Sequence, residues 1–212
     1  MSGALAITSV TTVLKSLLSN ALIQQSAAVG MGDVTITSVP PDRIATGAEE
    51  HPLLNIHLYR LTPNSAWRHA STSAAPKEAQ QMMPLALDLH YLLTVYGEQD
   101  HQAEILLGHA IQCFYETSIL TREALLSSLA SISSSSGGGP MFIPSSLPDL
   151  TKQLEQIKIS PEFLSLDEMS KLWSSLQARA RLSVAYQVSV ILIENQHAQS
   201  TDQTRIAPEV IS

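Results

Sequence analysis

The stretch Pro84-Leu85-Ala86-Leu87-Asp88-Leu89-His90-Tyr91-Leu92-Leu93-Thr94-Val95-Tyr96-Gly97 alternates between two kinds of side chain. Leucine, tyrosine or valine fills every odd position from 85 to 95, whereas the even positions include Asp88, His90 and Thr94. Because successive side chains of a strand point to opposite faces, this period of two predicts a long strand with one buried and one solvent-facing side. About 12 residues of strand span roughly 40 Å, about twice the usual length. Such strands are common in proteins that dock against neighbours.

Helical and strand-like patterns flank the long strand on both sides. In chain order they predict a helix over 7–22, strands over 33–39 and 54–59, the long strand, a helix over 103–114, a short helix from 121, a strand over 154–159, a helix from 165 to 176 and a strand over 183–193. Asp100 is the expected N-cap of its helix, and Ser165 with Glu168 predicts a capping box. This order indicates an α+β fold with one mostly antiparallel sheet, long strands and helices packed on one side.

The chain reads as one domain over residues 1–194. A Ser/Gly-rich insertion at about 133–140 is expected to be flexible, because such sequences behave as flexible linkers. Residues 195–212 are polar and are expected to form a flexible C-terminal tail. The insertion interrupts one domain rather than separating two, because the strand over 183–193 needs a sheet to join.

Composition argues against several classes of protein. The net charge of −7 and the scattered basic residues disfavour a nucleic-acid partner, which requires clustered Lys and Arg. A single cysteine, Cys113, excludes an intramolecular disulfide. No stretch is apolar for the ~18 residues of a membrane span, and the N-terminus lacks the basic residues of a signal peptide, so we expect a cytoplasmic protein. Charged residues make up only 15% of the chain, which hints at surfaces covered by other subunits.

The sequence carries no recognisable catalytic motif. It lacks a phosphate-binding glycine loop, a nucleophile elbow and the His or Cys spacing of a zinc site, so no catalytic, cofactor or metal residue is predicted. Asp88 and His90 share one strand face and, with His57 on a neighbouring strand, could converge on a metal. The favoured alternative is that Asp88 and His90 line a polar face or hydrogen-bond a partner at an interface.

Trp67 and Arg68 form a second candidate interface, inside the long irregular segment that follows the second strand. Exposed tryptophan and arginine side chains are typical anchors of protein interfaces. The alternative, equally open from the sequence, is that Trp67 folds back over the edge of the core.

Several segments together resemble a known family. They are Ala6 to Thr11, Asp33 to Thr37, Pro40 to Ile44, Leu58 to Asn64, Leu85 to Gly97, Ala103 to Gly108, Met169 to Trp173 and Tyr186 to Val190. In their order and spacing, the chain resembles the tail-terminator (cap) proteins of extracellular contractile injection systems, such as the antifeeding prophage and the Photorhabdus virulence cassettes. The resemblance covers residues 5 to about 194 and leaves out the Ser/Gly insertion and the C-terminal tail.

The resemblance implies a structural role instead of catalysis. Proteins of that family are thought to form a six-fold ring on the end of the inner tube distal to the baseplate, where they stop growth and anchor the last layer of sheath. It therefore implies three partners: other copies of this chain, the inner tube protein and the sheath protein. The chain would be located in the cytoplasm first and in the assembled, phage tail-like particle afterwards.

On this reading, tube or sheath arms would add a strand to an exposed sheet edge. The strand from Val184 to Ile193, with Val188 and Val190 on it, is the predicted edge. Two other functions stay open: an adaptor or cargo-binding module of the same machine, and, more distantly, a small hydrolase.

Overall fold

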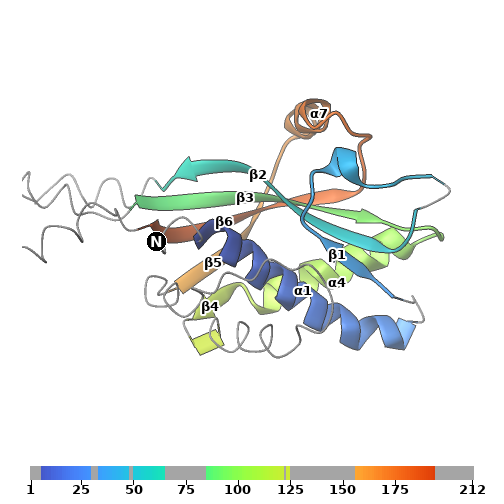
Figure 1. Cartoon of the computed structure of the whole chain (residues 1–212), viewed down its shortest axis with the longest axis horizontal. Coiled ribbons are helices and arrows are strands. Elements are labelled where there is room, and N and C mark those ends of the chain that lie inside the picture. Colours follow the sequence, from blue (N-terminus) through green and yellow to red (C-terminus); the bar gives the residue numbers. More distant parts are fainter. Residues whose placement is uncertain are drawn as a thin grey trace, which may run out of the picture.

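The fold is a single curled sheet with helices on both sides, seen in a computed structural model that describes residues 6–29, 33–47, 50–64, 85–121, 123–124 and 156–193 (Figure 1). In chain order its elements are α1 (Ala6–Val29), β1 (Thr35–Thr37), the 3-10 helix η2 (Pro41–Arg43), β2 (Leu53–Pro63), β3 (Leu85–Tyr96), α4 (Gln102–Glu116), β4 (Ile119–Thr121), β5 (Gln156–Glu162), α7 (Leu166–Ser175) and β6 (Ser183–Ile193). The predicted α+β class is confirmed.

The sheet has six strands in the order β1-β2-β3-β6-β5-β4. Only β1 and β2 run parallel; every other neighbouring pair is antiparallel. The long strand predicted from the opening sequence is β3, and it lies at the centre between β2 and β6. The helix over 7–22 extends to Val29, and the second strand continues to Pro63, beyond the predicted ends.

The core lies between one face of this sheet and the two helices α1 and α4 (Figure 1). The odd residues of β3 from Leu89 to Val95 are almost fully buried there, as their alternation predicted. Two contacts fix the helices on the sheet: the Tyr91 hydroxyl lies 2.8 Å from Oγ1 of Thr11, and Phe114 packs edge-on against Tyr186 with ring centroids 5.0 Å apart.

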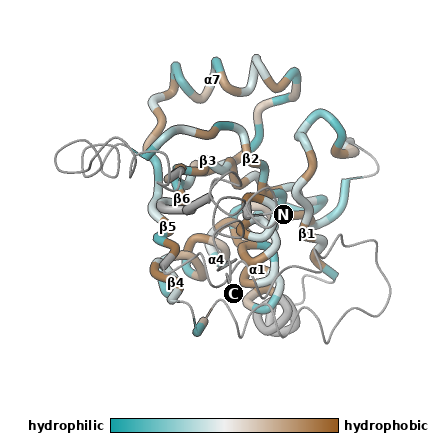
Figure 2. Tube along the Cα trace, turned by 60° about the vertical axis from the view of Figure 1, so that its left-hand side comes forward, coloured by the Kyte–Doolittle hydropathy of each residue, from teal (hydrophilic) through white to brown (hydrophobic). Residues whose placement is uncertain are grey.

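The opposite face of β3 is also buried, so the expectation of a solvent-facing side is wrong for this strand. Asp88 and His90 are 7% and 4% exposed, and Leu92 and Thr94 are fully buried. The cause is tertiary: α7 lies on this side of the sheet, away from α1 and α4 (Figures 1 and 2). Its Trp173 is buried. Two of the helices thus share one face as predicted, and the third lies across the other.

The last strand, β6, is not an edge strand, so the prediction that the strand from Val184 to Ile193 forms an exposed sheet edge is wrong. It pairs with β3 along its whole length and with β5 from Ala185 to Ser189. Val188 is fully buried in the core. The alternation of β6 could not distinguish a central strand from an edge strand, because both show the same period.

The strand β5 runs through Pro161, where the sequence predicted an end. Proline lacks an N–H and is tolerated where that group would face a free edge. The N–H of Ile159 donates to the carbonyl of Ser118, on the β4 side. Two residues on, the nitrogen of Pro161 faces the same side. There β4, which pairs only with residues 156–158, has ended. Pro161 therefore blocks further pairing along this edge.

Of the two predicted helix starts, the one at α7 is confirmed and the one at α4 is wrong. The capping box of α7 is confirmed, because the Ser165 hydroxyl accepts from the Glu168 N–H while the Glu168 carboxylate accepts from the Ser165 N–H. Asp100 is not the cap of α4. His101 takes that position with φ 64°, and Gln102 Oε1 instead accepts from the N–H groups of residues 98 and 99.

Candidate functional site

A β-bulge in β2 brings together a cluster of polar side chains. The register with β3 shifts between Leu58 and Arg60, so that Leu58 lies opposite Tyr91 and Arg60 lies opposite His90. A bulge inserts one extra residue and re-aims the side chains that follow it. Without this shift, Arg60 would lie on the core-facing side of the sheet, as Leu58 does. With the shift, Arg60 lies on the same face of the sheet as His90.

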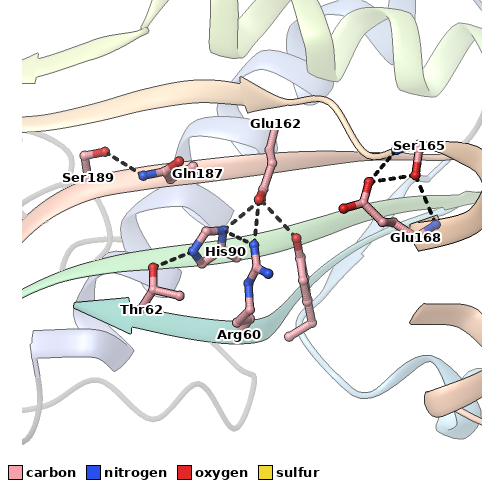
Figure 3. Close-up of polar contacts among 9 residues, drawn as sticks. Arg60, Thr62, His90, Glu162, Ser165, Glu168, Gln187 and Ser189 are labelled. Carbon is pink, nitrogen blue, oxygen red and sulfur yellow. Dashed lines mark hydrogen bonds and ion pairs between the residues drawn. The ribbon is translucent and has the colours of Figure 1, made fainter. Parts of the chain in front are cut away.

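Glu162, the last residue of β5, holds this cluster together (Figure 3). Its carboxylate accepts a hydrogen bond from the Tyr59 hydroxyl at 2.9 Å and from Nη2 of Arg60 at 2.7 Å. The same carboxylate lies 2.8 Å from Nδ1 of His90. Three strands, β2, β3 and β5, thus meet at one acidic side chain. We call Tyr59, Arg60, Thr62, His90 and Glu162 the Glu162 cluster.

The cluster is largely closed to solvent. The His90 side chain is 5% exposed and the Glu162 side chain 17%, whereas Arg60 is half exposed. The second ring nitrogen of His90 lies 2.8 Å from Oγ1 of Thr62. Burial, together with the hydrogen bond to Glu162, raises the pKa of the Tyr59 hydroxyl well above its ordinary value, so this group stays protonated.

These contacts make the cluster a brace between strands. Each ring nitrogen of His90 has a partner, and the Glu162 carboxylate is shared among three side chains. A network of this kind fixes the strands it joins, because each polar group would be costly to leave unpaired. Among the described residues no three His, Cys, Asp or Glu side chains gather as a metal site. His57, considered above as a metal ligand together with Asp88 and His90, lies opposite Leu92, one residue pair beyond the bulge.

Two exposed apolar side chains follow the brace directly. Phe163 is 92% exposed and Leu166 is 88% exposed, and we call this pair the knob. Glu162 anchors the chain immediately before Phe163, and the capping box at Ser165 fixes the start of α7 immediately before Leu166. Large apolar side chains that are exposed and held in place are typical of interface anchors.

No pattern in the sequence predicts the exposure of the knob. Leu166 is in helical phase with Met169 and Trp173, so periodicity alone would place it on the buried side of α7. The Glu162 cluster was likewise missed, because its members come from three strands and only the bulge aligns them. A bulge leaves no reliable mark in a single sequence.

Some of the residues predicted for an interface are buried, and others lie outside the described residues. Asp88, His90 and Val188 are buried within the domain, and Asp88 accepts a hydrogen bond from Asn64 at 2.9 Å. Trp67 and Arg68 lie outside the described residues, as do the Ser/Gly insertion and the C-terminal tail. The backbone of Val190 belongs to β6, but its side chain is not described.

Comparison with known proteins identifies the relatives of this chain. A family model, the Pvc16 N-terminal domain, matches residues 9–205. Among solved structures, the sheath/tube terminator of the PVC extracellular contractile injection system in its extended state matches with a TM-score of 0.51 and 17% identity, over 90% of this chain and 57% of that one. The anti-feeding prophage cap, a tube-terminating cap, matches with a TM-score of 0.46 and 19% identity, over 84% of this chain and 54% of that one.

The chain thus spans little more than half the length of these two solved chains. No curated protein matches it. Within the described part of the chain, no helix has the length and apolarity needed to cross a membrane.

Proposed function

Since the chain belongs to the Pvc16 N-terminal domain family, we propose that it is a structural tube terminator of a contractile injection system. The observation that carries this proposal is the family match, which extends over residues 9–205 and so includes every strand of the sheet. The fold likeness to a sheath/tube terminator supports it. The motifs quoted from the sequence point the same way.

In this role the chain forms a ring of six copies on the end of the inner tube distal to the baseplate. The ring stops growth of tube and sheath and anchors the last sheath layer, so its partners are other copies of itself, the tube protein and the sheath protein. The chain is made in the cytoplasm and becomes part of the particle.

Two features of the molecule suit a permanent assembly. Only 15% of the residues are charged, and interface cores are depleted of charge. The knob exposes two large apolar side chains that a free monomer would gain from covering. The polar groups of the Glu162 cluster are engaged with one another, as suits a structural role.

Electron microscopy of particles assembled with and without the chain tests this function. We expect particles that lack it to have tubes of uncontrolled length or sheaths that detach. Restoring the chain should restore a uniform length. Normal particles that lack cargo would replace the terminator role with that of a cargo adaptor. Particles that are unchanged in every respect would overturn the proposal.

A further inference from the structure

The helix α7 is attached to the sheet much more lightly than the helices of the core. Trp173 is its one buried residue, whereas α4 buries six. Met169 and Leu172, which share a helical face with Trp173, are only half-buried. Because a region with few buried apolar contacts opens at a lower free energy, α7 should separate from the sheet more readily than α1 or α4.

Ion pairs fix the chain to the sheet on either side of α7. Before the helix, the Glu162 carboxylate accepts from Arg60 at 2.7 Å (Figure 3). After the helix, Nη2 of Arg181 donates to Oε2 of Glu50 at 2.8 Å. The Glu162 side chain is 17% exposed and the Glu50 side chain 10%. Largely buried ion pairs are costly to break by loss of one partner. We call these two pairs the pins and the segment 163–180 between them the strap.

The strands are paired directly outside both pins. On one side, β5 stays paired with β6 up to Glu162, which lies opposite Ala185. On the other side, the N–H of Val95 donates to the carbonyl of Leu182 at 3.2 Å, and β6 pairs with β3 from Ser183 onward. Movement of the strap therefore breaks none of these strand pairs, so it can occur while the sheet stays intact.

The strap has local contacts that support its helix away from the sheet. The capping box of Ser165 and Glu168 holds the start of α7, and Lys171 is paired with Asp167 one turn earlier. Gln177, just past the end of the helix, has φ 53°, a left-handed conformation that is common where helices end. All these features lie within the strap, so α7 can move as a helix.

The side of the sheet that faces α7 carries buried residues that are separate from the main core. Oγ of Ser183 lies 3.7 Å from Sδ of Met169, which places α7 over the start of β6. On the same face of β6, Ala185 is 1% exposed and does not belong to the core formed with α1 and α4. Thr94, opposite Ser183, is fully buried, and its Oγ1 has no hydrogen-bond partner among the described residues. A buried hydroxyl without a partner disfavours the closed arrangement, because water can bind the hydroxyl once this face opens.

We propose that the strap opens from the sheet as one unit, with the two pins as its fixed ends and with Trp173 as the side chain that holds it closed. Opening uncovers Ala185 and the Thr94 hydroxyl while the strands stay paired. The inference goes beyond the proposed function, because it gives the chain a moving part that changes position without unfolding of the domain.

Thiol labelling of introduced cysteines tests the opening. In the full chain with Cys113→Ala, the variant Ala185→Cys places a thiol beneath the strap. The matched control Ala110→Cys places one in the main core, at a residue that is 0% exposed. We expect the thiol at position 185 to react at least about tenfold faster than the thiol at position 110. Urea below the unfolding transition should hardly change the faster rate, because opening exposes little surface, and should raise the slower one. Equal rates with equal urea dependence would overturn the inference.

Two further variants should change the labelling at position 185 in opposite directions. Trp173→Ala removes the side chain that holds the strap closed and should raise the rate at least about tenfold. Thr94→Val removes the unpartnered hydroxyl and should lower the rate at least about threefold. Leu166→Ala, which changes an apolar side chain of α7 that is 88% exposed, is the control and should label like the parent. An unchanged rate in either of the first two variants would overturn the inference.

Hydrogen exchange of the unmodified chain does not depend on introduced cysteines. The hydrogen-bonded amides of α7 should share one protection factor, at least about a hundredfold below that of β3. Protection that rises from the ends of the helix to its centre would show fraying in place of opening as one unit, and would overturn the inference. Protection equal to that of β3 would overturn it as well, because α7 would then open only when the whole domain unfolds.

Discussion

Nδ1 of His90, at the centre of β3, lies 2.8 Å from Oε2 of Glu162, 72 residues further along the chain. This contact joins the middle of the sheet to the point where β5 leaves it for α7. Because Arg60 and Tyr59 donate to the same carboxylate, the last residue of β5 is held directly before Phe163. The brace thus connects the stability of the domain to the presentation of the exposed Phe163 side chain.

The first prediction concerns this brace. Replacing Glu162 by Ala removes the acceptor of three side chains and leaves the buried His90 and the half-buried Tyr59 without it. We expect the free energy of unfolding to fall by about 2–4 kcal/mol, as measured by urea denaturation. Glu168→Ala, which removes an exposed capping carboxylate, is the control and should cost about 1 kcal/mol or less. Equal losses for the two variants would contradict the brace.

The second prediction is a pH dependence that arises from His57. Burial lowers the pKa of His57 below its ordinary value of 6.5, although the carboxylate of Asp42 opposes this. Below pH 6.5 the unfolded chain therefore binds more protons than the folded chain at this site, so the stability it contributes is present above 6.5 and is lost as the pH falls. His57→Gln should reduce the loss of stability between about pH 7.5 and about pH 5.5. Parallel curves for parent and variant would argue against this site.

The third prediction concerns Gly108 on the exposed face of α4. Alanine in its place should stabilise the domain by about 0.5–1 kcal/mol, because glycine loses more backbone entropy on folding. A Cβ at this position would meet no atom within 4 Å, so we expect thermal denaturation to shift upward. A melting temperature at or below that of the parent would contradict this expectation.

The fourth prediction concerns the free edge at Pro161. Pro161→Val restores an N–H on the side of β5 where, among the described residues, no strand follows β4. The fold should persist, since Pro161 lies opposite Tyr186 in a regular register. An unguarded edge pairs with other chains, so light scattering on prolonged incubation should show more aggregation than in the parent. Aggregation equal to that of the parent would mean that Pro161 does not guard the edge.

The fifth prediction keeps the interface expected from the sequence at Trp67 and Arg68. Trp67→Ala/Arg68→Ala should weaken attachment of the chain to tube or sheath by at least tenfold, because such side chains anchor interfaces. Its melting temperature should stay within a degree or two of the parent's. A large fall in melting temperature would instead favour the alternative in which Trp67 covers the core.

The fold was predictable from the sequence to the extent that it depends on local patterns. The alternation of 85–96 and 183–193 predicted β3 and β6, and Ser165 with Glu168 predicted the capping box of α7. These features are determined by neighbours in the sequence, because a side-chain period or a cap involves residues only a few positions apart. The family resemblance also depends on local sequence, since it rests on short motifs and their order along the chain.

Only the tertiary structure decided what lies beside each element. β6 has the alternation of an edge strand and is central, and the polar side of β3 is covered because α7 crosses it. The Glu162 cluster depends on a one-residue shift of register, which reverses the face of every following side chain and leaves no local mark. The exposure of the knob likewise could not be predicted from periodicity, because Leu166 is in helical phase with Trp173 and yet is 88% exposed, whereas Trp173 is buried.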